Sequence, residues 1–196
     1  MAASAKDAVK AMKEEGVEFL DLRFVDLPGL VQHFSVPISS VDEGVFENGL
    51  YFDGSSVRGF QGIQESDMLL LPDLSTLQLD HFRDRKTMMV YCHVHDAVTG
   101  EAYSRDPRNI VRKAEAYLAS TGVADTVFMG PEAEFFIFDQ INFRNDPHES
   151  LIAIDSVEGP WTSGEDDGHG NLGHKPRTKQ GYFPVPPMDH YQDLRS

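Results

Sequence analysis

Two glutamates stand two residues apart in the segment MGPEAEFFIFD, residues 129–139. In a strand, residues i and i+2 point to the same side, so Glu132 and Glu134 would share a face with Cβ atoms about 6.5 Å apart. Two anions on one face are costly to bury unpaired, so this face should meet a basic side chain or a metal ion. Carboxylate oxygens suit Mg²⁺ and Mn²⁺, and pairs of such ions commonly assist phosphoryl transfer.

A second interpretation of these glutamates is that both are solvated on the outer face of an edge strand, since exposure is the usual fate of Glu. Phe136 and Phe138 would lie on the same face, however, so this side is not simply polar surface. The pattern therefore favours the floor of a cleft that faces a cation.

The segment NGLYFDGSSVRGFQGIQESDMLLLPD, residues 48–73, holds many functional groups between apolar flanks. Its Asp-Gly, Ser and Gly residues are typical of turns, so one interpretation is a loop that only joins structured elements. The density of polar side chains also suits a binding loop. The polar residues are Asp53, Ser55, Ser56, Arg58, Glu65 and Asp67.

Other candidate groups are weaker. The prolines of GYFPVPPMD, residues 181–189, predict a rigid extended segment in which Tyr182 or Phe183 could simply be buried. His93 and His95 would share a strand face and could bind a metal, but a solvated or core-edge pair is the alternative. The sequence contains no GxxxxGK[ST], GxGxxG or GxSxG motif, so a nucleotide would not bind through one of those loops.

Composition narrows the class of protein. The 196 residues carry a formal net charge of -15, which disfavours non-specific binding to nucleic acid or to an anionic membrane. The one cysteine, Cys92, excludes an intrachain disulfide, fits a reducing compartment and is expected to be a small buried apolar residue. No signal peptide and no apolar run of about 18 residues is seen, so we expect a soluble, intracellular protein.

The elements that position these groups fall into two regions. Residues 1–100 are rich in strands: a helix capped by Ser4 is followed by a hairpin, VEFLDLRFVD and LVQHFSV around a Pro-Gly turn. A short helix then ends at Asn48-Gly49, and MLLLPD and KTMMVYCHVHD read as two more strands.

The pattern changes near residues 103–106, where we place a domain boundary. Asp106 and Pro107 predict the start of a helix that runs to Gly122. DTVFMGPEAEFFIFD, residues 125–139, then predicts a strand, with SLIAIDSV as its antiparallel partner across a polar loop.

Three of these segments, taken in order, resemble the amino-terminal part of bacterial glutamine synthetase of the large, class I type. They are YFDGSSVRGFQGIQESDMLLLPD, MGPEAEFFIFD and GYFPVPPMD, and DLRFVDLPGLVQHFSVP is similar to that family as well. The resemblance extends from about Val17 to the end of the chain. It implies a glutamate–ammonia ligase, which joins ammonia to glutamate at the expense of ATP through γ-glutamyl phosphate.

The resemblance also implies the α+β class and a division into two domains. Residues 1–105 would form a β-grasp domain, and residues 106–196 would be the first, incomplete part of a catalytic domain with an antiparallel sheet and helices. The resemblance implies a homo-oligomer with active sites between subunits, and the family implies that this oligomer is a dodecamer. The expected compartment is the cytoplasm. Glutamate, ammonium and ATP are the implied partners, with no role for nucleic acid or a membrane.

Site residues follow from the matched motifs. Glu132 and Glu134 match two metal-binding glutamates, each serving a different one of two Mg²⁺ or Mn²⁺ ions. Asp53 matches the aspartate that helps to bind ammonium and accepts its proton, and Ser56 matches the serine beside it. Both would act from the neighbouring subunit. Tyr182 matches the tyrosine of the ammonium pocket.

Two glutamates cannot complete two shells of about six ligands each. The family supplies the other ligands, and most of the nucleotide site, from sequence beyond residue 196, so the chain is expected to be an inactive amino-terminal fragment. One alternative is a related γ-glutamyl ligase that uses an organic amine, although Asp53 and Ser56 favour ammonia. Another is a non-catalytic assembly or binding module, against which the two retained glutamates argue.

Overall fold

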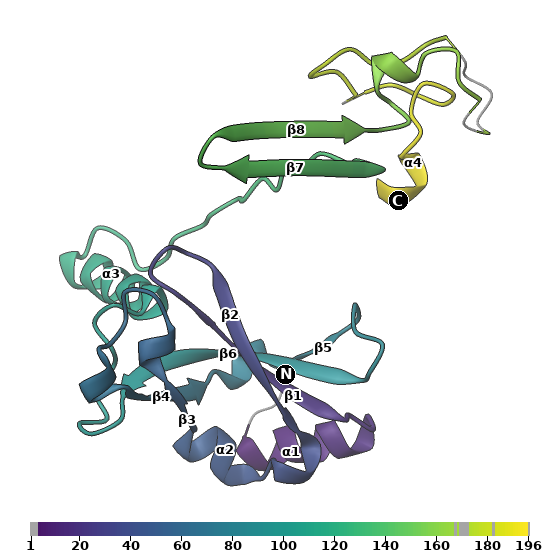
Figure 1. The fold of residues 1–196 in the computed structure, drawn as a ribbon. Coiled ribbons are helices and arrows are strands. Elements are labelled where there is room, and N and C mark those ends of the chain that lie inside the picture. Colours follow the sequence, from purple (N-terminus) through teal and green to yellow (C-terminus); the bar gives the residue numbers. More distant parts are fainter. Residues whose placement is uncertain (1–3, 167, 169–172, 182, 196) are drawn as a thin grey trace. The chain divides into compact units, whose positions relative to one another are not determined.

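The structure is a computed structural model that describes residues 4–166, 168, 173–181 and 183–195. The chain divides into two compact units, residues 1–128 and 129–196, and each is described by itself. Helices and strands occur in both units (Figure 1), which confirms the α+β class.

The first unit is built on a mixed sheet in which the strand order is β2-β1-β6-β4-β3, with β5 also paired to β6. The strands β1 and β6 are parallel, and all the other pairs are antiparallel. The hairpin and the two further strands expected from the sequence are confirmed, whereas β3 and β5 were not predicted. The strands are β1 (Phe19–Val25), β2 (Val31–Pro37), β3 (Leu50–Asp53), β4 (Asp67–Pro72), β5 (Gln78–Asp80) and β6 (Thr87–Asp96).

Two helices, α1 (Ala5–Glu14) and α2 (Glu43–Asn48), cover one face of this sheet (Figure 1). Each begins at a side-chain cap: Ser4 accepts a hydrogen bond from the backbone N–H of Asp7, and Asp42 accepts one from Val45. Such caps satisfy amides that have no partner within the helix. Both predicted helices are therefore confirmed.

The core lies between these helices and the sheet. Alternate residues of β1, Leu20 and Leu22, and of β6, Val90 and Val94, point into it because neighbouring strand residues face opposite sides. Cys92 is buried in the same row, and burial raises the pKa of its thiol to about 12. The expectation of a small, buried cysteine is confirmed.

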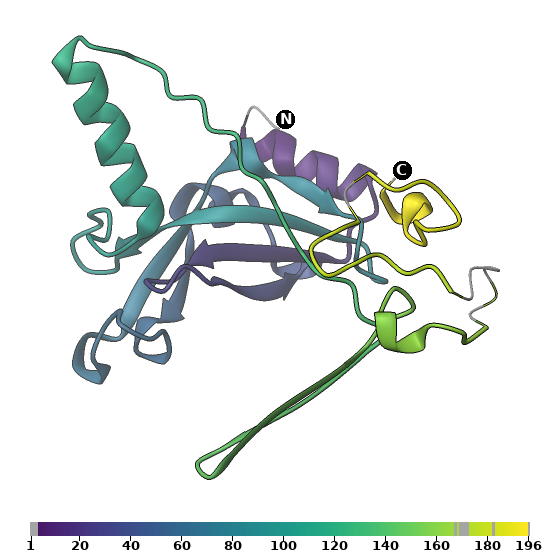
Figure 2. The same cartoon turned by 90° about the horizontal axis from the view of Figure 1, so that it is seen from above.

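The helix α3 (Pro107–Thr121) follows the sheet (Figure 2). Asp106 caps its first turn, Pro107 occupies the first helical position, and Gly122 ends it in the left-handed conformation with φ of 68°. These are the start and stop signals that predicted it.

The strand predicted at residues 125–139 is wrong. The structure has no regular secondary structure from residue 124 to residue 138, and the apolar side chains of Met129 and Phe135 are exposed. A strand needs a neighbour to pair its N–H and C=O groups, and none of the described residues pairs with this segment.

In the second unit, the strand β8 (Glu149–Asp155) pairs instead with β7 (Gln140–Asp146), so the predicted partner was also wrong. A two-residue turn joins these strands, and the short loop makes this hairpin easier to close than the pairing predicted across a longer loop. Both faces of the hairpin are exposed. A short helix, α4 (Gln192–Arg195), lies near the carboxyl end.

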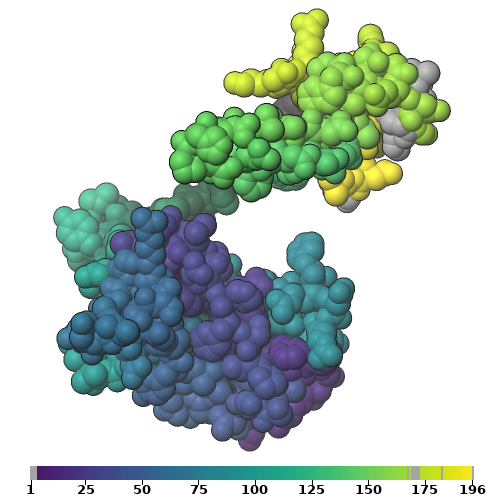
Figure 3. All heavy atoms as spheres, viewed as in Figure 1, coloured from purple at the N-terminus to yellow at the C-terminus, as the bar shows by residue number. Residues whose placement is uncertain are grey.

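Short 3₁₀ helices complete the structure: η1 (Ile38–Ser40), η2 (Gly54–Ser56), η3 (Ile63–Glu65), η4 (Leu74–Thr76) and η5 (Pro160–Thr162). The loop between β5 and β6 projects from the first unit (Figure 3), and Phe82 within it is 99% exposed. Over the described part of the chain, no helix is both long and apolar enough to cross a membrane.

Candidate functional site

Asp53 lies at the point where β3 ends and η2 begins. One of its carboxylate oxygens accepts hydrogen bonds from the backbone N–H of Ser55 at 2.8 Å and from the Ser55 hydroxyl at 2.6 Å. The other oxygen accepts one from the Ser56 hydroxyl at 3.2 Å. The turn chemistry read from the sequence therefore forms, and it fixes the orientation of an exposed carboxylate.

These contacts also control the charge of Asp53. The hydrogen bonds from the Ser55 hydroxyl and the Ser55 backbone, followed by those from Ser56, hold the pKa of the Asp53 carboxyl below its usual value of 3.8. Partial loss of water around this carboxylate raises its pKa, but by less than the two Ser55 hydrogen bonds lower it. The group is anionic at neutral pH and suits a cationic ligand.

Gly54 explains why the turn contains glycine. Its backbone N–H donates to the carbonyl oxygen of Ser66 at 2.7 Å, so the turn lies directly against the residue that precedes β4. A Cβ atom at this position would clash with the side chain of Met68 and lie 3.2 Å from the Ser66 carbonyl oxygen. Only a residue without a side chain fits at this distance.

Glu132 and Glu134 lie in the irregular segment of the second unit, and both are exposed. Nearby, the rings of Phe136 and Phe138 are stacked with centroids 6.1 Å apart. The described residues include no group of three or more His, Cys, Asp or Glu side chains that could hold a metal ion. The two glutamates thus supply carboxylate oxygens without a third protein ligand in the described part of the chain.

The structure brings Asp53 and Ser56 together in the first unit, while Glu132 and Glu134 belong to the second. Tyr182 lies outside the described residues.

His93 and His95, weighed as possible metal ligands, make different contacts. The Nε2 atom of His93 lies 3.8 Å from Asp73 Oδ2, and the Nδ1 atom of His95 lies 3.0 Å from the carbonyl oxygen of Gly100. Both are partly buried at the edge of the core.

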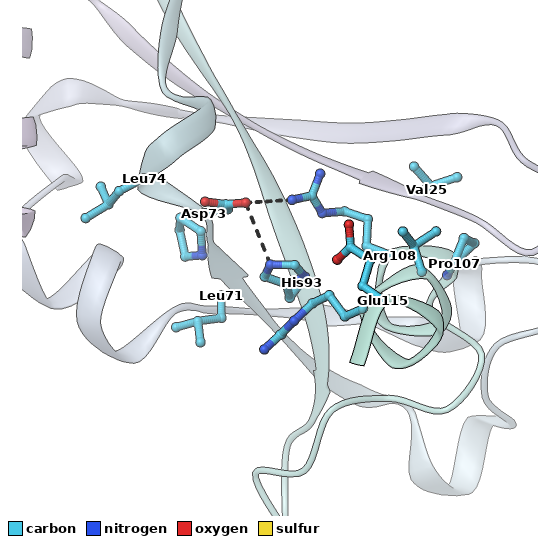
Figure 4. A pocket seen from close by; sticks show the side chains of 11 residues that line it. Val25, Leu71, Asp73, Leu74, His93, Pro107, Arg108 and Glu115 are labelled. Atoms are coloured by element: carbon cyan, nitrogen blue, oxygen red, sulfur yellow. Dashed lines mark hydrogen bonds and ion pairs between the residues drawn. The ribbon is translucent and has the colours of Figure 1, made fainter. Parts of the chain in front are cut away.

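An open hollow of about 910 Å³ lies between α3 and the sheet of the first unit (Figure 4). Arg108 Nη2 donates to Asp73 Oδ2 at 2.6 Å there, and His93 faces the same carboxylate. Burial, and then the charges of Arg108 and Arg112, keep the pKa of His93 below 6.5, so this imidazole is mostly neutral at pH 7.

Sequence reasoning missed this hollow, although His93, weighed there as a possible metal ligand, lines it. The available signal was Arg108 in the first turn of a well-marked helix. Its partner, Asp73, follows a strand 35 positions earlier, so their meeting depends on how α3 packs on the sheet.

Comparisons with known proteins agree on one family. The model described as "Glutamine synthetase, beta-Grasp domain" matches residues 16–97, and the model described as "Glutamine synthetase, catalytic domain" matches residues 104–196. The first range covers the mixed sheet, and the second begins just before α3.

Individual relatives agree with the models. A glutamine synthetase of Mycolicibacterium smegmatis is 58% identical over 98% of this chain, and one of Frankia alni is 54% identical over 100% of it. The cryo-electron microscopy structure of Plasmodium falciparum glutamine synthetase superposes with a TM-score of 0.79 at 24% identity, over 98% of this chain and 38% of that one. At that identity the solved structure supports the fold alone.

The chain spans 41% of the length of each of these two bacterial relatives. Within that span it contains a β-grasp domain followed by the start of a catalytic domain, as the family resemblance implied. The chain belongs to the glutamine synthetase family.

Proposed function

We propose that the protein containing this chain is a glutamine synthetase, which joins ammonia to glutamate through γ-glutamyl phosphate and releases glutamine, ADP and phosphate. The observation that carries the proposal is the 58% identity, over 98% of the chain, with a relative of that name. Because the chain covers 41% of that relative, the complete reaction needs residues that the chain does not provide. The chain alone is expected to be inactive.

Asp53 is proposed to bind ammonium from the neighbouring subunit and to accept its proton, with Ser56 beside it. The lowered pKa of Asp53 supports the first part of this role, since a fully ionised carboxylate attracts NH₄⁺ over a wide pH range. The same low pKa makes Asp53 a weak base. Asp53 would therefore first bind NH₄⁺ by charge and accept its proton only in a later step. Tyr182 is proposed for the same pocket from its sequence motif.

Glu132 and Glu134 are proposed to bind one each of two Mg²⁺ or Mn²⁺ ions. Their carboxylates are of the preferred chemical type, but each ion needs about six ligands, so further ligands must come from outside this chain. When bound, such ions would neutralise charge on the phosphate that ATP transfers. Glu132 and Glu134 would contribute the first anchoring oxygens from a segment that has no strand partner among the described residues.

The proposal includes a homo-oligomer, a dodecamer by family membership, with Asp53 and Ser56 completing the active site of the next subunit. We further propose that the β-grasp domain ends at residue 105 and that the protein is located in the cytoplasm. Glutamate, ammonium and ATP are the proposed substrates.

Kinetics of the full-length parent test the function. We expect ATP turnover that depends on glutamate, on ammonium and on Mg²⁺ or Mn²⁺. Methylamine in place of ammonium should give much slower turnover. The reverse preference would contradict the proposal and favour a γ-glutamyl-amine ligase.

The same assay tests the metal residues. Glu132→Gln and Glu134→Gln, which remove charge and retain size, should each lower kcat/KM by a factor on the order of 100 or more while the oligomer stays intact. Glu149→Gln, in the exposed hairpin, is the matched control and should retain activity. Unchanged activity in both glutamate variants would refute the metal assignment.

A further inference from the structure

Three side chains at the start of α3 and just before it, those of Arg105, Asp106 and Arg108, contact the sheet of the first unit or its loops. Arg105 Nη1 donates to the carbonyl oxygens of Gly59 at 2.8 Å and Phe60 at 2.6 Å. The buried Asp106 accepts a hydrogen bond from the backbone N–H of Val94 at 3.0 Å, and Arg108 pairs with Asp73. Each contact reaches a different part of the β-grasp sheet or its loops.

Of these three, only Arg105 reaches the loop that carries Asp53. This loop leaves β3 at Asp53 and returns to β4 at Asp67. Its inner end is held by the backbone hydrogen bond from Gly54 to Ser66, and its outer part is held by Phe60, which is buried. The guanidinium of Arg105 binds two successive carbonyl oxygens at this outer anchor.

Phe60 explains why the loop would keep its fold without Arg105. Its ring packs against Tyr103 and Phe24, with centroid distances of 5.2 and 6.2 Å. Removing the guanidinium would leave this aromatic contact in place. What is lost is the charge-assisted restraint on the backbone between Phe60 and the Asp53 turn.

We propose that Arg105 is a positioning residue for ammonium binding. It ties the loop bearing Asp53 and Ser56 to the backbone immediately before α3, where the two domains of the chain meet. The inference rests on the proposed function. Arg105 thus holds the β-grasp loop against the point where the catalytic-domain match, residues 104–196, begins. A shift of the loop by a fraction of an ångström would misplace the Asp53 carboxylate without unfolding the domain.

Steady-state kinetics of the full-length parent provide the first test. Arg105→Ala should raise the KM for ammonium about tenfold, with the KM for ATP nearly unchanged, and Arg105→Lys should recover part of the loss because it retains one donor. Arg108→Ala is the matched control: it removes an arginine from the same segment and breaks a contact that does not reach the loop. It should leave the ratio of the ammonium and ATP KM values unchanged.

Hydrogen exchange of the same proteins is independent of the chemistry. Backbone amides of residues 54–60 should exchange faster in Arg105→Ala than in the wild type or in Arg108→Ala. Unchanged exchange in this loop would overturn the proposal, as would faster exchange with an unaltered KM for ammonium. If the wild-type parent showed no ammonium-dependent turnover, the proposed function would fail, while the exchange measurement would still decide whether Arg105 holds the loop.

Discussion

Asp21 is the most deeply buried carboxylate of the sheet, with 0% of its surface exposed. It accepts hydrogen bonds from Ser35 at 2.6 Å and Arg23 at 2.8 Å, and His33 Nδ1 lies 2.6 Å away. Arg23 in turn pairs with Asp80, so the charges form a connected network on the face opposite the core. A buried charge is tolerated when it is paired and hydrogen-bonded in this way.

Acid should weaken this network. Burial raises the pKa of Asp21, but hydrogen bonds from His33, Ser35 and Arg23 outweigh it, so the folded-state pKa lies below 3.8. The folded state therefore binds this proton less readily than the unfolded state. The stabilisation from Asp21 is fully present above about pH 4 to 5 and is lost as the pH falls through the folded-state pKa.

Asp21→Asn should remove this contribution to the acid dependence and reduce the free energy of unfolding by about 3 kcal/mol at pH 7, because Arg23 loses a charged partner. Urea unfolding of the chain, followed by circular dichroism between pH 2.5 and 7, measures both effects. Glu14→Gln on the exposed side of α1 is the control. If the difference in free energy of unfolding between the wild type and Asp21→Asn were the same at every pH, the ionised Asp21 carboxylate would not stabilise the fold as described.

At the residue scale, the sequence predicted those side-chain arrangements in which all the partners lie within a few residues of one another. The Asp53 turn needed only its neighbours, Ser55 and Ser56, to be recognisable. The Asp21 network was not predicted because His33 and Ser35 reach Asp21 through the register of β1 against β2, and Asp80 reaches Arg23 from a strand that the sequence analysis did not find. The proposed roles of Glu132, Glu134 and Tyr182 stay predictions.

At the scale of elements, Asp106 has a double function. One carboxylate oxygen accepts from the backbone N–H of Arg108 at 3.0 Å and caps α3, and the other accepts from the backbone N–H of Val94 in β6. The same side chain thus starts the helix and attaches it to the sheet. The sequence predicted the first role only, because the contact with β6 depends on tertiary packing.

Asp106→Ala should therefore cost more than the loss of an ordinary cap. We expect a decrease of about 3 kcal/mol in the free energy of unfolding, since the buried N–H of Val94 also loses its partner. Ser4→Ala, which removes the exposed cap of α1, should cost about 1 kcal/mol. Chemical unfolding of both variants tests the difference, and equal losses would mean that the contact with Val94 contributes little.

Elements with strong end signals were predicted, as were the longer strands β4 and β6, whereas the two shortest strands of the first unit were missed. The helices α1, α2 and α3 have caps at their first residues, and the hairpin of β1 and β2 surrounds a Pro-Gly turn. β3 and β5 have four and three residues, too few to show a period. Residues 125–139 alternate as a strand does, but alternation says nothing about whether a partner strand is available.

At the scale of the whole molecule, the segment from residue 122 to 139 should be the site most open to proteolysis. It is long, exposed and without regular structure after Gly122. Limited digestion with chymotrypsin should cut first after Phe128, Phe135 or Phe136, because proteases need an extended, unpaired backbone. Mass spectrometry of the first products measures this.

Phe82 provides the control for that digestion. It is also fully exposed, but it lies in a short loop between paired strands. Phe82→Ala should therefore leave the first products unchanged. A first cut at Phe82, or within residues 19–72, would show that the sheet is less stable than its packing indicates.

The parallel pairing of β1 with β6 has a consequence for how the chain folds during synthesis. Phe19 pairs with Thr87, and Arg23 pairs with Tyr91, so the two central strands come from opposite ends of the β-grasp domain. The hairpin of β1 and β2 can close as soon as it leaves the ribosome, because its contacts are local. The centre of the sheet cannot close until β6 has emerged, which leaves the inner edge of β1 unpaired and exposed to other nascent chains for most of the synthesis of the domain.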